Sequence, residues 1–388
     1  METDKDVVSR FLTYIKTDTQ SDPESQTCPS TDKQFVLAGM LKRELENMGV
    51  QDVRLDDKCY LYALIPSNCG RKTPSVGFIA HLDTSPDVSG KDVRPVFAED
   101  GCGRRIIKSD GSTLLGADDK AGIAEIMTAV DYILNHADFK HGDVYIAFTP
   151  DEEIGRGADF FDLEFFKADF AYTMDGGETG EFSYENFNAA EAEIRITGKN
   201  THPGSAKGIM RNAIEAASAL ACKINSLLPV PEKTEGREGF VHIHQINGTV
   251  EECLLRCLVR DFDKQKFIGK KAALKELSKK TMEEFPGIII ECGINDQYYN
   301  MAEITAKYPQ VRDIALQAMK NTGIEPVISV TRGGTDGARL SFMGLPCPNI
   351  FAGGVNFHSR DEYVPVESME AATRCIVEIV RITAGLQQ

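Results

Sequence analysis

The sequence predicts an α/β fold in which a mostly parallel sheet is covered by helices and a smaller α+β two-layer domain is inserted. Short apolar runs alternate with helical stretches up to about residue 187 and again from residue 301, as in a parallel sheet buried on both faces. In between, the order β-α-β-β-α-β with alternating strands is typical of a sandwich with one solvated sheet face. We therefore predict a larger domain at 1–187 and 301–388 and an inserted domain at 188–300.

The composition indicates which partners the protein does not bind and in which cellular compartment we expect it. The chain has 388 residues with 43 basic and 59 acidic side chains, a formal net charge of −16. Because nucleic acids and anionic membranes attract basic surfaces, we expect no binding to either. The first residues lack the basic and apolar regions of a secretory signal, and no apolar run approaches membrane-spanning length. Ten cysteines without a C-x-x-C pair favour reduced thiols, so we expect a soluble, cytoplasmic protein.

The elements of the larger domain follow from apolar periodicity and from boundary residues. Ser30 or Thr31 is a suitable N-cap for a helix that ends before Gly49. The expected helices are 6–15, 30–47, 118–135, 310–321 and 366–383, and the expected strands are 61–65, 76–80, 144–148, 170–174, 327–330 and 349–352.

The inserted domain is predicted from strands in which apolar and charged residues alternate. Ala192, Ile194 and Ile196 alternate with polar residues, which indicates a half-exposed antiparallel strand. The expected strands are 191–197, 240–246, 252–261 and 288–292, and the expected helices are 208–227 and 264–285.

Two consecutive carboxylates, Glu152 and Glu153, follow the apolar run 144–148 in the stretch TPDEEIG. Burying unpaired carboxylates in a core is costly. The same placement presents a metal ligand and a proton acceptor side by side. An isolated pair of this kind is more often a solvated acidic turn, so its interpretation depends on the other strand ends.

Other side chains that can bind metal or transfer protons also follow predicted strands or begin a predicted helix. Ligands of open α/β sheets bind beyond the carboxyl ends of the strands, so these side chains can converge in one crevice. His, Asp and Glu without cysteine suit zinc or another borderline divalent ion, and two His with three carboxylates are enough for a pair. Taken singly, each has a simpler interpretation as a hydrogen-bonded loop, a helix N-terminal charge or a turn. The residues concerned are His81, Asp83, Asp118, Asp175 and His358.

Five motifs together resemble those of the peptidase T family of tripeptide aminopeptidases. This family is part of the dinuclear zinc exopeptidases, which include carboxypeptidase G, dipeptidase V and succinyl-diaminopimelate desuccinylase. The resemblance covers nearly the whole chain and is specific in combination. The motifs are HLDTSPD from His81, LGADDKAG from Leu115, TPDEEIGRG from Thr149, THPG from Thr201 and RGGTDG from Arg332.

The resemblance implies a zinc exopeptidase-like fold with a catalytic domain, a lid, and two zinc ions. His81, Asp118 and Asp175 would hold one zinc ion. Asp118, Glu153 and His358 would hold the other, so that Asp118 bridges them. Asp83 would orient His81, as ligating imidazoles generally require.

The expected chemistry follows from the charge of the ions. Two cations roughly 3.5–4 Å apart lower the pKa of a bridging water and polarise the scissile carbonyl. Glu152 would act as general base and return the proton to the leaving amine. The resemblance suggests His202, brought in by closure of the lid, as the oxyanion donor. The alternative for His202 is a structural histidine before Pro203 and Gly204.

The function of three further residues is open on the sequence. Arg332 precedes two glycines and suits a phosphate, the C-terminal carboxylate of a peptide substrate, or a structural salt bridge. In a peptidase the substrate carboxylate is the favoured anion. His242 and His244 face one side of the strand 240–246, which fits a third metal site or, as we favour, a solvent or subunit face.

We therefore expect a zinc-dependent aminopeptidase that cleaves the N-terminal peptide bond of short peptides, chiefly tripeptides. The alternatives are a related dizinc dipeptidase or N-acyl-amino-acid amidohydrolase, and a non-catalytic metal-binding homologue. A homodimer through the lid domain is a further expectation. The stretch between Asp87 and Leu115 is shorter than the resemblance leads us to expect, so substrate length selection is less constrained than the metal chemistry.

Overall fold

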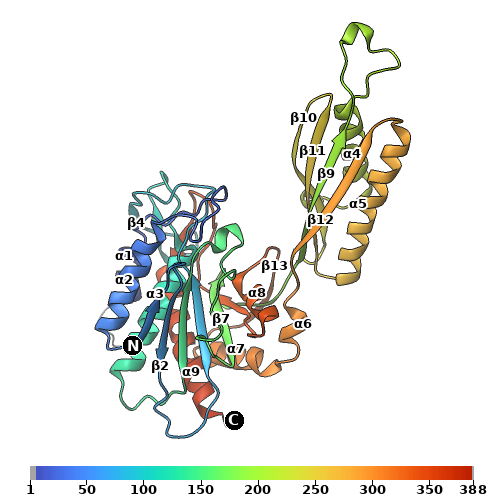
Figure 1. Cartoon of the computed structure of the whole chain (residues 1–388). Coiled ribbons are helices and arrows are strands. Elements are labelled where there is room, and N and C mark those ends of the chain that lie inside the picture. The colour runs from blue at the N-terminus through green and yellow to red at the C-terminus, as the bar shows by residue number, and fades with distance from the viewer. Residues whose placement is uncertain (1–5, 387–388) are drawn as a thin grey trace. The chain divides into compact units, whose positions relative to one another are not determined.

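The computed structural model describes residues 6–386, which form two compact units (Figure 1). The smaller unit comprises Glu185–Asn300 and Val330–Gly334, and the larger unit comprises the rest of the described chain. We predicted an insert at 188–300. The smaller unit begins three residues earlier and also includes the strip Val330–Gly334, in which Arg332 binds backbone carbonyls of the smaller unit.

The larger unit contains an eight-stranded sheet with the order β1-β2-β6-β3-β7-β14-β8-β13. The four central strands β6, β3, β7 and β14 are mutually parallel, whereas β1 with β2, β2 with β6, and β14 with β8 are antiparallel. The strands are β1 Asp52–Leu55, β2 Leu61–Ile65, β3 Val76–His81, β6 Val144–Thr149, β7 Phe170–Gly176, β8 Glu181–Asn186, β13 Val327–Thr331 and β14 Asn349–Phe351.

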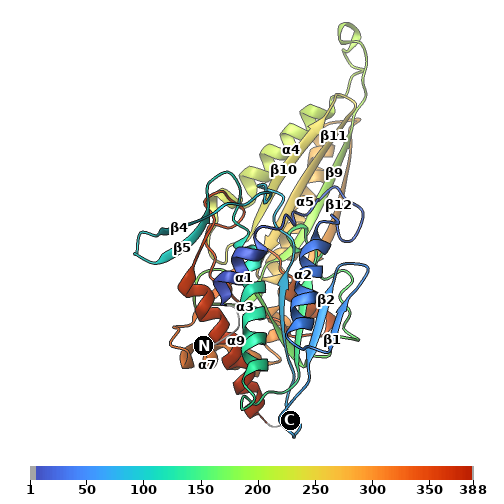
Figure 2. The ribbon, with the colours of Figure 1, turned by 90° about the vertical axis from the view of Figure 1, so that its left-hand side faces the viewer.

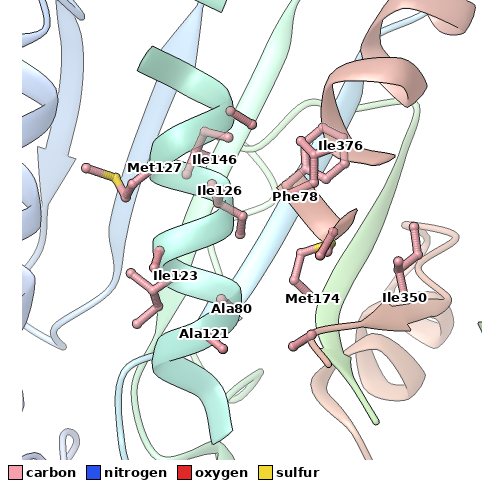
Figure 3. Close-up of a cluster of buried hydrophobic side chains, with 14 of the residues drawn as sticks. Phe78, Ala80, Ala121, Ile123, Ile126, Met127, Ile146, Met174, Ile350 and Ile376 are labelled. Atoms are coloured by element: carbon pink, nitrogen blue, oxygen red, sulfur yellow. The ribbon is translucent and has the colours of Figure 1, made fainter. Parts of the chain in front are cut away.

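Helices cover one face of this sheet. Ile126 of α3 and Ile376 of α9 lie in the same buried cluster as Phe78 of β3 and Met174 of β7 (Figure 3). The helices of the larger unit are α1 Val7–Tyr14, α2 Gln34–Asn47, α3 Ala117–Asn135, α6 Ala302–Thr305, α7 Pro309–Asn321, α8 Asp336–Met343 and α9 Val366–Gly385, with a 3-10 turn at Glu152–Ile154.

The other face of the sheet carries a second cluster. Ile79 of β3 points to it because successive side chains of a strand alternate between faces. Phe161 and Phe166 from the irregular segment after β6 cover this face together with Leu340 of α8. The prediction of a sheet covered on both faces is therefore confirmed, but the second cover is mainly an aromatic segment.

Two helix starts differ from the prediction, and both differences have a local cause. Residues Ser30 and Thr31 do not cap α2, because the Ser30 hydroxyl donates to Asp151 and the Thr31 hydroxyl donates to a backbone carbonyl. Helix α4 begins at Ala213 and not at residue 208, since Asn212 accepts the Ile214 N–H as an N-cap.

A small sheet of three strands was not expected. It has the order β15-β5-β4, formed by β4 Pro95–Glu99, β5 Arg105–Ser109 and β15 Tyr363–Pro365. The β4–β5 hairpin stands out at the side of the larger unit (Figure 2). Its strands lack a clear apolar alternation, since Val96 and Phe97 are adjacent and both exposed.

The smaller unit has the predicted order β9-α4-β10-β11-α5-β12 and a four-stranded antiparallel sheet ordered β10-β11-β9-β12. Both helices lie on the same side of the sheet (Figure 2), and residues of α4, α5, β9 and β11 share one buried cluster. The elements are β9 Asn188–Thr197, α4 Ala213–Leu227, β10 Phe240–Gly248, β11 Glu252–Asp261, α5 Lys264–Glu284 and β12 Ile289–Tyr298, with 3-10 turns at Pro203–Ser205 and Pro231–Lys233.

One described segment, Ala213–Lys233, is long and apolar enough by composition to cross a membrane. The helix within it is α4, whose residues Ala216, Leu220 and Ile224 are fully buried against the sheet of the smaller unit. Packing accounts for these buried residues, whereas Ile214 and Leu227 of the same helix are exposed.

Candidate metal centre and active site

The parallel strands bring the candidate residues to one edge of the large sheet. His81 ends β3 and lies opposite Thr149, the last residue of β6. Asp175 lies near the end of β7, the other parallel neighbour of β3. Because the carboxyl ends of parallel strands share an edge, residues from three separate parts of the chain meet there.

Two imidazoles face the two oxygens of one aspartate. The Nε2 atom of His81 lies 2.8 Å from Asp118 Oδ1 and 3.7 Å from Asp175 Oδ1. The Nε2 atom of His358 lies 3.3 Å from Asp118 Oδ2 and 2.8 Å from Glu153 Oε2. The five residues expected to hold metal therefore lie together, in two groups that share Asp118.

The fully buried carboxylate of Asp83 connects both groups. Its Oδ1 atom lies 3.4 Å from His81 Nδ1 and accepts the Glu152 N–H at 2.9 Å. Its Oδ2 atom accepts the Glu153 N–H at 3.2 Å. We expected a contact with His81 only. The side chain also fixes the backbone that carries the proposed base and a proposed ligand.

Asp119, to which we assigned no role from the sequence, is also a member of the cluster. Ligand atoms of His81, Asp119 and Asp175 lie within 4.8 Å of one another. Asp119 Oδ2 accepts the His81 backbone N–H at 3.2 Å, and Asp119 is fully buried. The peptide bond between Asp118 and Asp119 is cis, and both residues have non-helical dihedral angles within α3.

The segment that carries Glu152 is held from the N-terminal part of the chain. Asp151 adopts a left-handed conformation with a φ of 58°, and its buried carboxylate accepts the Ser30 N–H at 2.7 Å. The same carboxylate accepts the Ser30 hydroxyl at 2.5 Å and the Gln34 side-chain amide at 2.7 Å. No local pattern signals this contact, because its partners are more than a hundred residues apart.

The crowding of carboxylates shifts the proton affinities of the site. Burial, followed by the charge of Asp175, raises the pKa of Glu152 well above its ordinary value. Burial and the charge of Asp118 raise the pKa of Glu153 to about 8. Hydrogen bonds to Asp118 and Glu153 raise the pKa of His358 to about 11. The carboxylates at this edge of the sheet thus stabilise positive charge on the imidazole, and the same carboxylates would attract a metal cation.

The donors fit a pair of divalent cations. They are imidazole nitrogens and carboxylate oxygens without a thiol, the set that suits zinc and other borderline ions. Among the described residues, the Oε1 atom of Glu153 is buried without a hydrogen-bond partner. Such an atom is costly to bury unless something binds it, and a cation beside Glu153 would do so.

Three histidines that we considered from the sequence lie in the smaller unit. His202 is exposed, and its Nδ1 atom accepts the Gly204 N–H at 3.1 Å. His242 and His244 have ring centroids 6.3 Å apart, and His244 Nε2 lies 3.4 Å from Glu191. The three-residue groups suited to metal within residues 6–386 all contain His81, so this histidine pair forms no such group.

Arg332 differs most from expectation. One terminal nitrogen of its guanidinium donates to the carbonyls of Gly236 at 2.7 Å and Glu238 at 3.2 Å, and the other donates to the Thr234 hydroxyl at 3.2 Å. The guanidinium also lies over the ring of Phe187, 5.2 Å from its centroid. In this structure both terminal nitrogens of the guanidinium therefore bind groups of the chain itself.

A carboxylate-rich cluster with two imidazoles lies at the carboxyl edge of an α/β sheet, in a chain with a β-α-β-β-α-β insert, and this arrangement suits a two-domain hydrolase. Residues 77–382 match the sequence profile of Peptidase family M20/M25/M40. The chain belongs to this family, and it is a peptidase.

Curated relatives extend over almost the entire chain. Peptidase T of Caldanaerobacter subterraneus subsp. tengcongensis is 47% identical over 405 aligned positions, covering 97% of this chain and 98% of the relative. Peptidase T of Clostridium perfringens (strain 13 / Type A) is 49% identical over 407 positions, covering 98% and 99%. The resemblance to the peptidase T family is confirmed. Both alignments exceed 388 positions, so these relatives contain segments that this chain lacks, whereas a shortened stretch between Asp87 and Leu115 stays a prediction.

Solved structures show the same fold. Aminopeptidase PepT from Bacillus cereus ATCC 10987 has a TM-score of 0.79 at 24% identity, covering 97% of this chain and 98% of that chain. A tripeptidase from Staphylococcus aureus subsp. aureus Mu50 has a TM-score of 0.81 at 22% identity, with 98% of each chain covered. The Bacillus subtilis YXEP protein, described as a dinuclear metal binding peptidase, has a TM-score of 0.69 at 15% identity, again with 98% of each chain covered. The predicted fold class is confirmed.

Proposed function

We propose that this peptidase is a zinc-dependent aminopeptidase that removes the N-terminal residue from short peptides, chiefly tripeptides. The observation that carries the proposal is the shared aspartate: the two oxygens of Asp118 face His81 and His358 separately. Relatives named peptidase T, at 47–49% identity over nearly the whole chain, support the choice of substrate.

The proposed ligands of the two ions divide around that aspartate. His81, Asp118 and Asp175 would hold one ion, and Asp118, Glu153 and His358 would hold the other. When bound, two divalent cations polarise the scissile carbonyl and lower the pKa of an attacking water. Asp83 would keep the Nδ1–H of His81 turned inward, so that its Nε2 atom is available to an ion.

Glu152 is the proposed general base. It would take the proton of the attacking water and later deliver it to the leaving amine. Its backbone N–H is held by Asp83, and the preceding residue, Asp151, is held by Ser30 and Gln34. Burial raises its pKa, which brings a carboxylate closer to the range in which a base works near neutral pH.

The smaller unit would supply the oxyanion donor. We propose His202 for this role because hydrolysis of a peptide bond needs a donor for the developing negative charge. We also propose that Arg332 stabilises the loop that carries Gly236 and Glu238, in place of the substrate-binding role expected from the sequence. A cytoplasmic location and a homodimer through the smaller unit stay predictions.

The test is the substitution Glu152→Gln, assayed with unblocked tripeptides and with metal content measured on the same sample. We expect kcat to fall by about 10²–10⁴-fold at unchanged metal content. Glu178→Gln is the matched control, because Glu178 is an exposed glutamate just beyond Asp175. Full activity in Glu152→Gln at equal metal content would show that another group is the base.

Substrate blocking separates the alternatives. The proposed aminopeptidase should release an N-terminal residue from unblocked tripeptides and leave N-acetylated tripeptides intact. Equal cleavage of the acetylated peptides would favour the N-acyl-amino-acid amidohydrolase, and a preference for dipeptides would favour the dipeptidase.

A further inference from the structure

Glu362 has a buried carboxylate that the proposed mechanism does not use. It lies four residues after His358, immediately before β15, and is 1% exposed. A carboxylate so deeply buried needs donors around it, because an unpaired charge in a protein interior is strongly destabilising. The groups that donate hydrogen bonds to the Glu362 carboxylate indicate what this side chain does.

All three donors are backbone N–H groups at the start of α3. The Oε2 atom of Glu362 accepts the N–H of Leu115 at 2.7 Å and of Gly116 at 2.8 Å. The Oε1 atom accepts the N–H of Asp118 at 3.0 Å. The first N–H groups of a helix have no partner within the helix, so this carboxylate supplies acceptors that the helix cannot.

Asp118 has particular need of such support. Its dihedral angles, φ −83° and ψ 103°, and those of Asp119 are not helical, although both residues lie within the bounds of α3. Gly116 before them has a left-handed φ of 84°. The backbone that presents the shared aspartate is thus irregular, and Glu362 accepts N–H groups on both sides of Ala117.

The same contact fixes the loop of His358. This loop is closed at its base by two backbone hydrogen bonds between Val355 and Tyr363, 2.9 and 3.1 Å long. His358 itself is 40% exposed and has a left-handed φ of 59°. Because Glu362 belongs to this closed loop and binds the Asp118 N–H, His358 and Asp118 are held at a defined separation.

We propose that Glu362 is a positioning residue for the metal centre, which sets the affinity of the group formed by Asp118, Glu153 and His358. This inference rests on the proposed function, since it requires that the group binds a cation. Partners that orient metal ligands typically change metal affinity by about 10- to 100-fold when they are replaced.

Glu362→Gln changes the acceptors with almost no change in shape. A glutamine side chain has one acceptor oxygen and one NH2 group, whereas both oxygens of Glu362 accept N–H groups. In the variant, the N–H of Asp118 or those of Leu115 and Gly116 must therefore face another donor.

Asp131→Asn is the matched control. Asp131 is a carboxylate of α3 that is 1% exposed, like Glu362, but it binds Arg10 and Asn135 and no residue of the metal centre. Both changes replace a buried carboxylate with its amide. Only Glu362→Gln removes an acceptor from the backbone of a proposed ligand.

The experiment measures zinc binding by the metal-free proteins, in competition with a chromophoric chelator, together with their melting temperatures. We expect Glu362→Gln to bind one of two zinc ions about 10- to 100-fold more weakly than the wild type. Asp131→Asn should melt earlier and bind both ions within about twofold of the wild type. If Glu362→Gln does not fold, Glu362→Asp, whose carboxylate is withdrawn by one methylene, should show the same weakening.

The outcomes separate two failures. If the wild type binds two zinc ions and the folded Glu362 variant binds both with unchanged affinity, the positioning role is wrong and the proposed function stands. If the wild type binds no zinc, the proposed zinc function fails and this inference fails with it. Equal weakening in Asp131→Asn would also refute the positioning role, because any loss of stability would then have the same effect.

Discussion

Replacement of Asp83 by asparagine is the most informative single perturbation of the site. The carboxylate contacts His81 and accepts the N–H groups of both Glu152 and Glu153, one on each oxygen. An asparagine side chain has one acceptor oxygen, so one of the two N–H groups must face an NH2 group. The change therefore disturbs the base or a proposed ligand without removing either of them.

The magnitude follows from the burial of the contact. Asp83 is fully buried, and a buried donor left without an acceptor costs about 1–3 kcal/mol. If this cost falls on the arrangement that binds the transition state, kcat/KM decreases by about 5- to 160-fold, since each 1.36 kcal/mol is tenfold. This agrees with the effect of about 10- to 100-fold that is typical of residues that orient metal ligands.

The assay is kcat/KM on an unblocked tripeptide, with zinc affinity measured on the metal-free protein. Asp56→Asn is the control, because Asp56 also accepts two backbone N–H groups, from Lys58 and Tyr60, but in the turn before β2. We expect the control to keep wild-type activity and affinity. If Asp83→Asn kept both within twofold, the contacts to the two amides would have no functional weight.

Three further predictions test other parts of the molecule. Burial raises the pKa of Glu125, whose carboxyl oxygens have no hydrogen-bond partner among residues 6–386. The folded protein therefore favours the neutral form of Glu125. The contribution of this group to stability is full below its ordinary pKa of about 4.3 and is lost as the pH rises through the raised pKa. Glu125→Met should therefore raise the free energy of unfolding in urea by about 1–3 kcal/mol at pH 8 and by less at pH 5, and an equal gain at both pH values would contradict this. His202→Ala should lower kcat by about 10²–10³-fold at similar KM and metal content, whereas kcat within twofold of wild type would exclude it as oxyanion donor. Arg332→Lys should lower the melting temperature without changing KM, because a single lysine nitrogen cannot reproduce the fork in which one nitrogen binds Gly236 and Glu238 and the other binds Thr234. A raised KM at an unchanged melting temperature would restore the substrate-binding interpretation.

The central strands and the clustering of the candidate residues could be predicted because each leaves a local signal. The buried strand Val144–Thr149 is a continuous apolar run, and chemically active residues directly follow it. Parallel strands share a carboxyl edge, so the ends of such runs indicate which distant residues meet. The insert was predictable for a similar reason, since its strands alternate and its helices are long.

Contacts between distant loops leave no such signal. Glu362 and Leu115 are 247 residues apart, and neither the charge of one nor the backbone N–H of the other is unusual in a sequence. The β4–β5 hairpin was missed because its exposed strands need no apolar periodicity. For Arg332 a substrate carboxylate was favoured over a phosphate or a structural salt bridge, because an arginine before two glycines suits many anions. Its actual partners are backbone carbonyls, which any sequence offers.

The larger unit is formed by chain segments before and after the insert, and this has a consequence for the order in which its site residues are synthesised. His81, Asp118, Glu153 and Asp175 are synthesised before the insert, but His358 and Glu362 are synthesised only after it. A ribosome-bound chain that has just finished the insert carries all three residues proposed for one ion and lacks only His358 of those proposed for the other. The second group of the proposed centre can therefore form only after nearly the whole chain has been translated.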